Sequence, residues 1–278
     1  VVADNCALFV NGVFENYQTL DGSTLFLGAF FFTIQIYGDF SGYSDIAIGC
    51  ARLFGIDLMQ NFKYPYFSRD IAEFWRRWHI SLTTWFRDYI YIPLGGSRAG
   101  KWKSFRNTLV IFLVSGFWHG ANWTFVAWGA YHALLFLPLL LLGQSRRYRD
   151  SVAENSFLPS VKELTQMGAT FLLVLLGWIL FRSEDISQAA VYLERMFNVS
   201  LFSAPQLVGL GFGQLLLKKC FFFTALMFIV EWIGRKQAHG LMIEDLSLPV
   251  RYVIYTVLLI IIYGFDASNP QGFIYFQF

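Results

Sequence analysis

Residues 108–142 read TLVIFLVSGFWHGANWTFVAWGAYHALLFLPLLLL, an apolar run that is interrupted once, at the polar stretch HGAN (119–122). A transmembrane helix needs about 20 predominantly apolar residues to cross a hydrocarbon core about 30 Å thick. Glycine and asparagine at the interruption are typical of a turn. We therefore expect two apolar helices that meet at HGAN, with His119 at the break between them.

The composition extends this expectation to the whole chain. Of the 278 residues, 56% are hydrophobic and 14% are charged, with a mean hydropathy of +0.47, whereas a soluble domain is about a quarter charged. Some of the apolar stretches are short, which fits broken or tilted helices. The sequence predicts an all-α, polytopic integral membrane protein with a single membrane domain over 1–278. Its other apolar stretches are 24–37, 163–181, 208–233 and 250–265.

The distribution of charge indicates an orientation, and the small net charge of +2 argues against a nucleic-acid partner. Between positions 60 and 106 the chain carries nine basic residues and three acids, which the positive-inside rule places on the cytoplasmic side. A first arm from Thr108 to Trp118 would penetrate about 15–18 Å, so that His119 would lie near mid-depth. The basic residues are Lys63, Arg69, Arg76, Arg77, Arg87, Arg98, Lys101, Lys103 and Arg106, and Arg146, Arg147 and Arg149 follow the second arm.

The stretch SRDIAEFWRRWHISLTTWF (68–86) has the apolar spacing of one helical face. Asp70 is the expected N-cap, with Glu73 three residues later. His79 shares the apolar stripe with Trp75, and we expect one helix that lies flat or dips into the membrane, presenting His79 inward and its arginines to water or phosphates. PLGG (93–96) ends it. The stripe consists of Ile71, Phe74, Trp75, Trp78, Leu82, Trp85 and Phe86.

His119 is the first candidate for chemistry, because an ionisable group within an apolar segment is costly and usually functional. Gly116 and Gly120 leave space for close backbone approach, and Asn122 offers an amide that can orient a reactant. Low polarity favours the neutral imidazole, which can act as a general base.

The other three histidines have different expected roles. His79 is balanced between a functional and a packing role, His132 is expected to be a buried structural residue, and His239 lies in the polar loop KQAHG. No HxxxH or HxxE pattern and no thiolate cluster accompanies them, so no metal site is expected. The cysteines Cys6, Cys50 and Cys220 are expected to be buried small hydrophobes.

Two polar features keep alternative interpretations. GDFSGYSD (38–45) favours a helix broken at its glycines, and otherwise the lining of a polar channel. The basic clusters Arg76/Arg77 and Arg98/Lys101/Lys103 suit anionic lipid headgroups or a phosphate-rich molecule such as coenzyme A. LVGLGFG (207–213) has no βαβ context and is read as a flexible membrane entry.

Several motifs resemble, in order, those of the membrane-bound O-acyltransferase (MBOAT) family. They are FSGYSDIAIGCARLFGI, KYPYFSRDIAEFWRRWHISLTTWFRDYIYIPLGG, SGFWHGANWTFVAWGAYH and the C-terminal FIYFQF. The resemblance is detailed over residues 28–140 and is greatest to the bacterial branch, with its alginate and peptidoglycan O-acetyltransferase membrane subunits. It implies an MBOAT-type bundle of broken and re-entrant helices around a tunnel. It also implies that this chain, which begins without Met, is the C-terminal part of a longer one.

The resemblance implies roles for individual residues. His119 matches the family's essential histidine and His79 its second one, so both are expected to be catalytic. Substrate is expected to contact five further residues, Trp75, Trp78, Trp118, Asn122 and Arg76.

The implied reaction uses acetyl-CoA as co-substrate, with no bound cofactor. The acetyl group would cross the bacterial cytoplasmic (inner) membrane to a periplasmic or extracellular acetyltransferase partner, which modifies a polysaccharide. The alternatives are D-alanyl transfer to teichoic acids, O-acylation of a lipid or protein, and a transporter in which His119 relays protons.

Overall fold

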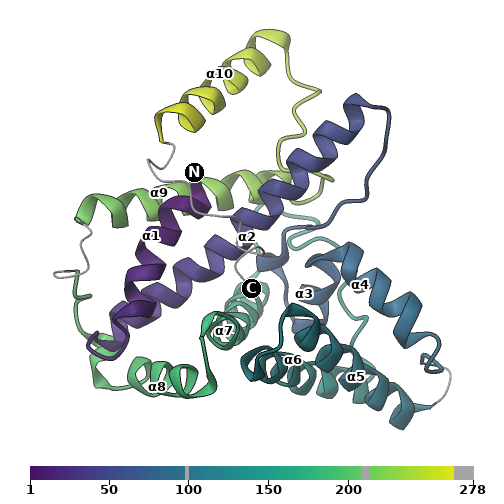
Figure 1. Ribbon diagram of the computed structural model, residues 1–278. Coiled ribbons are helices and arrows are strands. Elements are labelled where there is room, and N and C mark those ends of the chain that lie inside the picture. The colour runs from purple at the N-terminus through teal and green to yellow at the C-terminus, as the bar shows by residue number, and fades with distance from the viewer. Residues whose placement is uncertain (98–99, 208–212, 266–278) are drawn as a thin grey trace. The chain divides into compact units, whose positions relative to one another are not determined.

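The computed structural model describes residues 1–97, 100–207 and 213–265, and within them the chain is helical without a β-strand (Figure 1). The predicted all-α fold is confirmed. Arg98, most of LVGLGFG and the terminal FIYFQF lie outside the described residues. The helices are α1 (Val2–Glu15), α2 (Gly22–Leu53), α3 (Ile71–Arg77), α4 (Ile80–Phe86), α5 (Lys101–His119), α6 (Trp123–Leu141), α7 (Val161–Arg182), α8 (Ile186–Met196), α9 (Gln214–Gly234) and α10 (Leu248–Gly264).

The chain forms two compact units. One comprises Val1–Tyr43 with the described residues from Glu194 onward, and the other comprises Ser44–Leu193. Whether both belong to one membrane domain stays a prediction. All the predicted site residues fall in the second unit.

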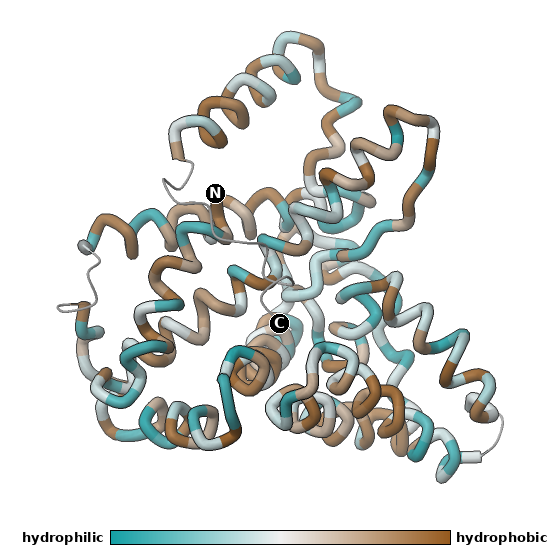
Figure 2. The backbone as a smooth tube through the Cα atoms, viewed as in Figure 1, coloured by the Kyte–Doolittle hydropathy of each residue, from teal (hydrophilic) through white to brown (hydrophobic). Residues whose placement is uncertain are grey.

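Two helices of the second unit, α6 and α7, are each long and apolar enough to cross a membrane, and Figure 2 shows their hydrophobic character. They contain 19 and 22 residues, which corresponds to about 28 and 33 Å. α10 is apolar but shorter. Each predicted apolar stretch overlaps a helix, and a short amphipathic helix, α8, follows α7.

α2 corrects one prediction, because it runs without interruption through GDFSGYSD. Glycine lowers helix stability by about 1 kcal/mol relative to alanine but does not end a helix. In the first unit Gly38 instead lies against α1, where an added Cβ would meet Val2 at 3.7 Å. A second correction concerns Cys50, which is exposed, while Cys6 and Cys220 are buried as expected.

The expected hairpin of two helices is confirmed by α5 and α6, which lie side by side (Figure 1). A Cβ at Gly116 would overlap the carbonyl oxygen of Phe125, and one at Gly129 would overlap that of Phe112. The two backbones therefore touch, which only glycine permits. α5 begins at Lys101 rather than at Thr108, so the helix itself is about 28 Å long, with its basic first turns preceding the apolar arm of 108–118. The depth of His119 in a bilayer stays a prediction.

The expected single helix over 71–86 is wrong, because it is broken between α3 and α4. Trp78 is extended and His79 adopts a left-handed conformation, with φ +44° and ψ +56°. A distant segment binds the freed backbone groups: Lys63 N donates to the Arg77 carbonyl, and Ile80 N donates to the Asn61 carbonyl, both at 2.9 Å. The Asn61 side chain also accepts from Ser81 N at 3.2 Å.

A buried ion network holds α3 in place. The Glu73 carboxylate, 1% exposed, lies 2.9 Å from Arg69 and 2.6 Å from Arg77. Arg69 also lies 3.1 Å from Asp150 in the loop before α7. Burial alone would raise the pKa of the Asp150 carboxyl, but hydrogen bonds and charge from Arg69 outweigh burial and lower it. The expectation that Arg77 faces water or phosphates is therefore wrong, whereas Asp70 caps α3 as predicted, accepting from Glu73 N at 2.7 Å.

Replacing Glu73 by Gln should destabilise the protein by about 3 kcal/mol, because the buried guanidinium of Arg77 loses its anionic partner and that of Arg69 loses one of its carboxylates. The matched control is Asp88→Asn, which removes the exposed ion pair with Arg87 and should leave stability unchanged. Thermal unfolding of both variants in detergent measures the difference. Equal midpoints would show that the network adds no stability.

Candidate active site

His119 is the last residue of α5, and its imidazole lies among aromatic rings from three helices. The ring centroids are 4.9 Å from Phe181 of α7, 5.3 Å from Trp128 of α6 and 5.0 Å from Trp118. Gly120 then ends the helix, at a place where a Cβ would lie 2.7 Å from the ring of Phe125. The chain thus turns directly after His119, with the ring of Phe125 packed against the turn.

His79 also lies near the Trp118 ring. Its centroid is 6.5 Å from that of Trp118 and 6.4 Å from that of Phe62. The two imidazoles are close enough to interact electrostatically. Burial lowers the pKa of His79 to about 4, so its ring is uncharged at neutral pH. The structure therefore brings together the two predicted catalytic histidines.

The left-handed backbone at His79 is itself informative. This conformation costs a residue other than glycine about 1–2 kcal/mol, and such strain gathers at functional sites. In a continuous helix, the side chain of residue 79 would lie on the same face as Trp75. The break instead turns His79 toward Trp118.

The three predicted tryptophans occupy different surroundings. Trp118 is 54% exposed, whereas Trp78 is 2% exposed. Trp78 packs on Trp178 with centroids 5.0 Å apart, and Trp75 lies 5.6 Å from Trp128. Trp118 is thus open to a ligand, while Trp78 supports the wall behind it.

Asn122 and Arg76 bind backbone groups. Asn122 caps α6 by accepting from Thr124 N at 3.0 Å, and it donates to the Glu184 carbonyl at 2.6 Å. Arg76 donates to the carbonyls of Ser145 and Tyr148, at 2.5 and 2.6 Å. Asn122 thus fixes the turn next to His119, whereas Arg76 fixes the loop that follows the far end of α6. Contact of either side chain with substrate stays a prediction.

His132 is fully buried, in agreement with the expectation of a core residue. Sequence reasoning placed Trp128 near His132 but did not identify Trp128, Trp178 or Phe181 as surrounding His119. Trp128 had a usable signal, because it lies four residues before His132 and hence on the same face of α6. Trp178 and Phe181 had none, since they belong to α7 and reach His119 only through tertiary packing.

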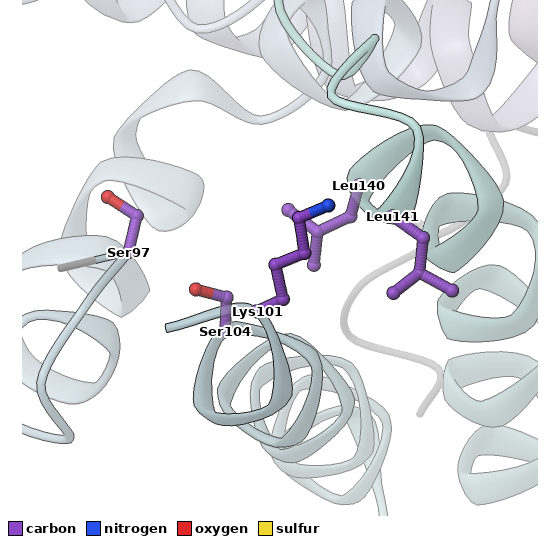
Figure 3. A pocket seen from close by; sticks show the side chains of 5 residues that line it. All are labelled: Ser97, Lys101, Ser104, Leu140 and Leu141. Carbon is purple, nitrogen blue, oxygen red and sulfur yellow. The ribbon is translucent and has the colours of Figure 1, made fainter. Parts of the chain in front are cut away.

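A small pocket of about 130 Å³ lies at the opposite end of the hairpin, lined by Ser97, Lys101, Ser104, Leu140 and Leu141. Figure 3 shows the Lys101 side chain extending toward Leu140. Lys101 begins α5 and His119 ends it, which separates them by about 27 Å along the axis. This pocket is therefore separate from the histidine site. Among the described residues, no group of three His, Cys, Asp or Glu side chains is arranged to hold a metal ion.

Comparison with known proteins gives this arrangement a context. Residues 12–157, which include both histidines and the whole α5–α6 hairpin, match the membrane-bound O-acyltransferase family (MBOAT). The chain belongs to this family. The expectation of a membrane-integral all-α fold follows from membership, and the resemblance noted in the motifs is confirmed.

The similar proteins include transferases with different named acceptors. The probable alginate O-acetylase of Pseudomonas putida is 41% identical over 78% of this chain and 42% of its own length. The peptidoglycan O-acetyltransferase of Helicobacter pylori is 37% identical over 72% of this chain and 36% of its own. The teichoic acid D-alanyltransferase of Streptococcus thermophilus is 40% identical over 36% of this chain and 26% of its own. The chain thus spans less than half the length of these relatives.

Two substitutions at His79 separate backbone strain from side-chain chemistry. His79→Gly should be more stable than His79→Ala by about 1 kcal/mol, because glycine adopts positive φ without strain. At Thr83, inside α4, the order should reverse, with alanine more stable than glycine by about 1 kcal/mol. Chemical unfolding of the four variants measures both differences. Alanine as the more stable residue at position 79 would contradict the left-handed conformation.

Proposed function

We propose that this chain carries the acyl-transfer site of a membrane O-acetyltransferase that serves the O-acetylation of an exported or cell-wall polysaccharide. One observation carries the proposal: two histidines from separate segments meet at one half-exposed tryptophan, Trp118, at a helix break. Family membership supports acyl transfer as the chemistry. The alginate and peptidoglycan O-acetyltransferase relatives support acetyl and polysaccharide as the groups transferred and modified.

In the proposed reaction, His119 is the general base. Its neutral imidazole accepts the proton of an acceptor hydroxyl as the oxygen attacks the carbonyl carbon of an acetyl thioester. The tetrahedral intermediate then collapses, the carbon–sulfur bond breaks, and the leaving thiolate takes the proton from the imidazolium. His79 orients or polarises a reactant across the Trp118 ring. The thioester is acetyl-CoA, a co-substrate rather than a bound cofactor.

The surroundings of His119 suit this chemistry. Three aromatic side chains on α5, α6 and α7 keep water away from most of the ring, while Trp118 stays accessible. Excluding water protects a thioester from hydrolysis and strengthens each polar interaction at the reacting atoms. A general base must also be reached by the acceptor hydroxyl, and the exposed side of Trp118 provides that access.

The proposed setting is the bacterial cytoplasmic (inner) membrane, with several spans. The basic region between positions 60 and 106 lies on the cytoplasmic side by the positive-inside rule. Donor thioester enters from there, and a periplasmic or extracellular acetyltransferase partner receives the acetyl group for the polysaccharide. A tunnel through the helices connects the two sides, and membrane lipids surround them.

His119→Ala should lower polysaccharide O-acetylation at least about 100-fold, the usual contribution of a general base. His239→Ala, in the polar loop KQAHG of the other unit, is the matched control and should retain full acetylation. Both variants are expressed in a strain deleted for the native gene, membrane abundance is measured by immunoblot, and ester-linked acetate on the purified polymer is quantified. Full acetylation by His119→Ala at normal abundance would refute the catalytic role.

A donor series tests the acyl group. Membranes with the wild-type protein should consume acetyl-CoA and leave long-chain acyl-CoA and a D-alanyl carrier-protein thioester unchanged. The D-alanyl alternative is supported by relatives that match a smaller part of this chain, and long-chain consumption would indicate lipid or protein acylation. Proton or solute flux in proteoliposomes without thioester consumption would favour a transporter instead.

A further inference from the structure

His132, on α6, is fully buried, and neither of its ring nitrogens has a hydrogen-bond partner among the described residues. Two indole rings lie against it: Trp75 at 5.0 Å between centroids with a 90° interplanar angle, and Trp128 at 5.2 Å and 72°. The indole N–H groups of Trp75 and Trp128 are also buried and have no partner within the described part of the chain. Unpaired polar atoms from α3 and α6 thus gather around one imidazole.

Packing alone does not account for this arrangement. Each buried polar group that lacks a partner costs about 1–3 kcal/mol, and buried polar groups in native proteins almost always have one. A phenyl ring at position 132 would fill a similar volume without any such cost. The polar atoms around His132 therefore indicate a bound group that supplies the missing hydrogen bonds.

The balance of donors and acceptors identifies the chemistry of that group. A neutral imidazole offers one donor and one acceptor, and each indole offers one donor only. Even if one indole donates to His132, two donors still require an acceptor from elsewhere. A single oxygen with two lone pairs, such as that of a water molecule, satisfies both.

The surroundings of His132 are closed to solvent, so that only a small group can fit beside it. His132 is 0% exposed and Trp128 is 1% exposed. On the side of α7, an added Cβ at Gly177 would lie 2.6 Å from the Nε2 atom of His132. Enclosed polar sites in proteins are ordinarily filled by ordered water.

We propose that His132, Trp75 and Trp128 enclose an internal water-binding site, and that His132 acts through it as a positioning residue for His119. The link is Trp128, whose ring lies 5.2 Å from His132 and 5.3 Å from His119, perpendicular to the latter. A hydrogen bond at its indole nitrogen fixes the rotation of Trp128 and thereby one wall of the His119 site. The positioning role rests on the proposed function, whereas the water site does not.

The water site is tested directly on the full-length protein in nanodiscs by cryo-electron microscopy at a resolution that shows ordered water. We expect a density peak within hydrogen-bond distance of His132 and the indole nitrogens, and its loss in His132→Phe. The 15N-indole NMR signal of Trp128 should shift in that variant, while the signal of the exposed Trp123 should not. A well-ordered map with no peak at His132 would overturn the water site.

The positioning role is tested by kinetics. His132→Phe should lower kcat for acetyl transfer at least 10-fold with little change in the KM for donor, and His132→Gln, which keeps a polar group, should recover part of the loss. Trp128→Phe should reproduce the defect, and the double variant should be no worse than either single one, because both act on the same water. Trp123→Phe is the matched control and should keep wild-type kinetics.

Two results would overturn the positioning role: wild-type kcat in a folded His132→Phe, or additive losses in the double variant. If His132→Phe does not fold, the kcat values of His132→Gln, Trp128→Phe and their double variant are compared in the same way. Failure of the proposed function is recognised separately, since it requires His119→Ala to remain active.

Discussion

The contact between the backbones of α5 and α6 is the constraint on which the site depends. At Gly116 and Gly129 no Cβ fits, because the carbonyl oxygens of Phe125 and Phe112 occupy its place. Interfaces between membrane helices rely on such small residues, since apolar side chains gain little by leaving lipid for each other. The close contact fixes the register of the hairpin, and with it the positions of His119 at the end of α5 and Trp128 and His132 on α6.

The second histidine is placed by a different device. α3 and α4 are separated by an extended Trp78 and a left-handed His79, and the strain persists because the segment from Asn61 to Lys63 binds the freed backbone groups. The ion network around Glu73 fixes α3 from the other side. Tertiary hydrogen bonds thus offset the local cost in backbone energy. The left-handed backbone in turn directs the His79 imidazole toward Trp118.

These features assign separate roles in the proposed chemistry to His119, Trp118 and His132. His119 stands among rings that exclude water, Trp118 leaves one approach open, and the polar atoms around His132 lie behind Trp128. Asn122 stabilises the turn beside this centre through a backbone hydrogen bond, and Arg76 does the same for the loop at the other end of α6.

The sequence by itself determined the all-α membrane class, the hairpin with its break at HGAN, and His119 at that break, because hydropathy, helical period and turn residues are local signals. It also indicated His79, but on a continuous helix. Only the tertiary structure decided the break at Trp78 and His79, since the backbone partners at Asn61 and Lys63 are remote from a helix whose own period is unbroken. It likewise decided that α2 stays intact and that α7 supplies Phe181 to His119. Contacts between distant segments depend on packing, which no local pattern encodes.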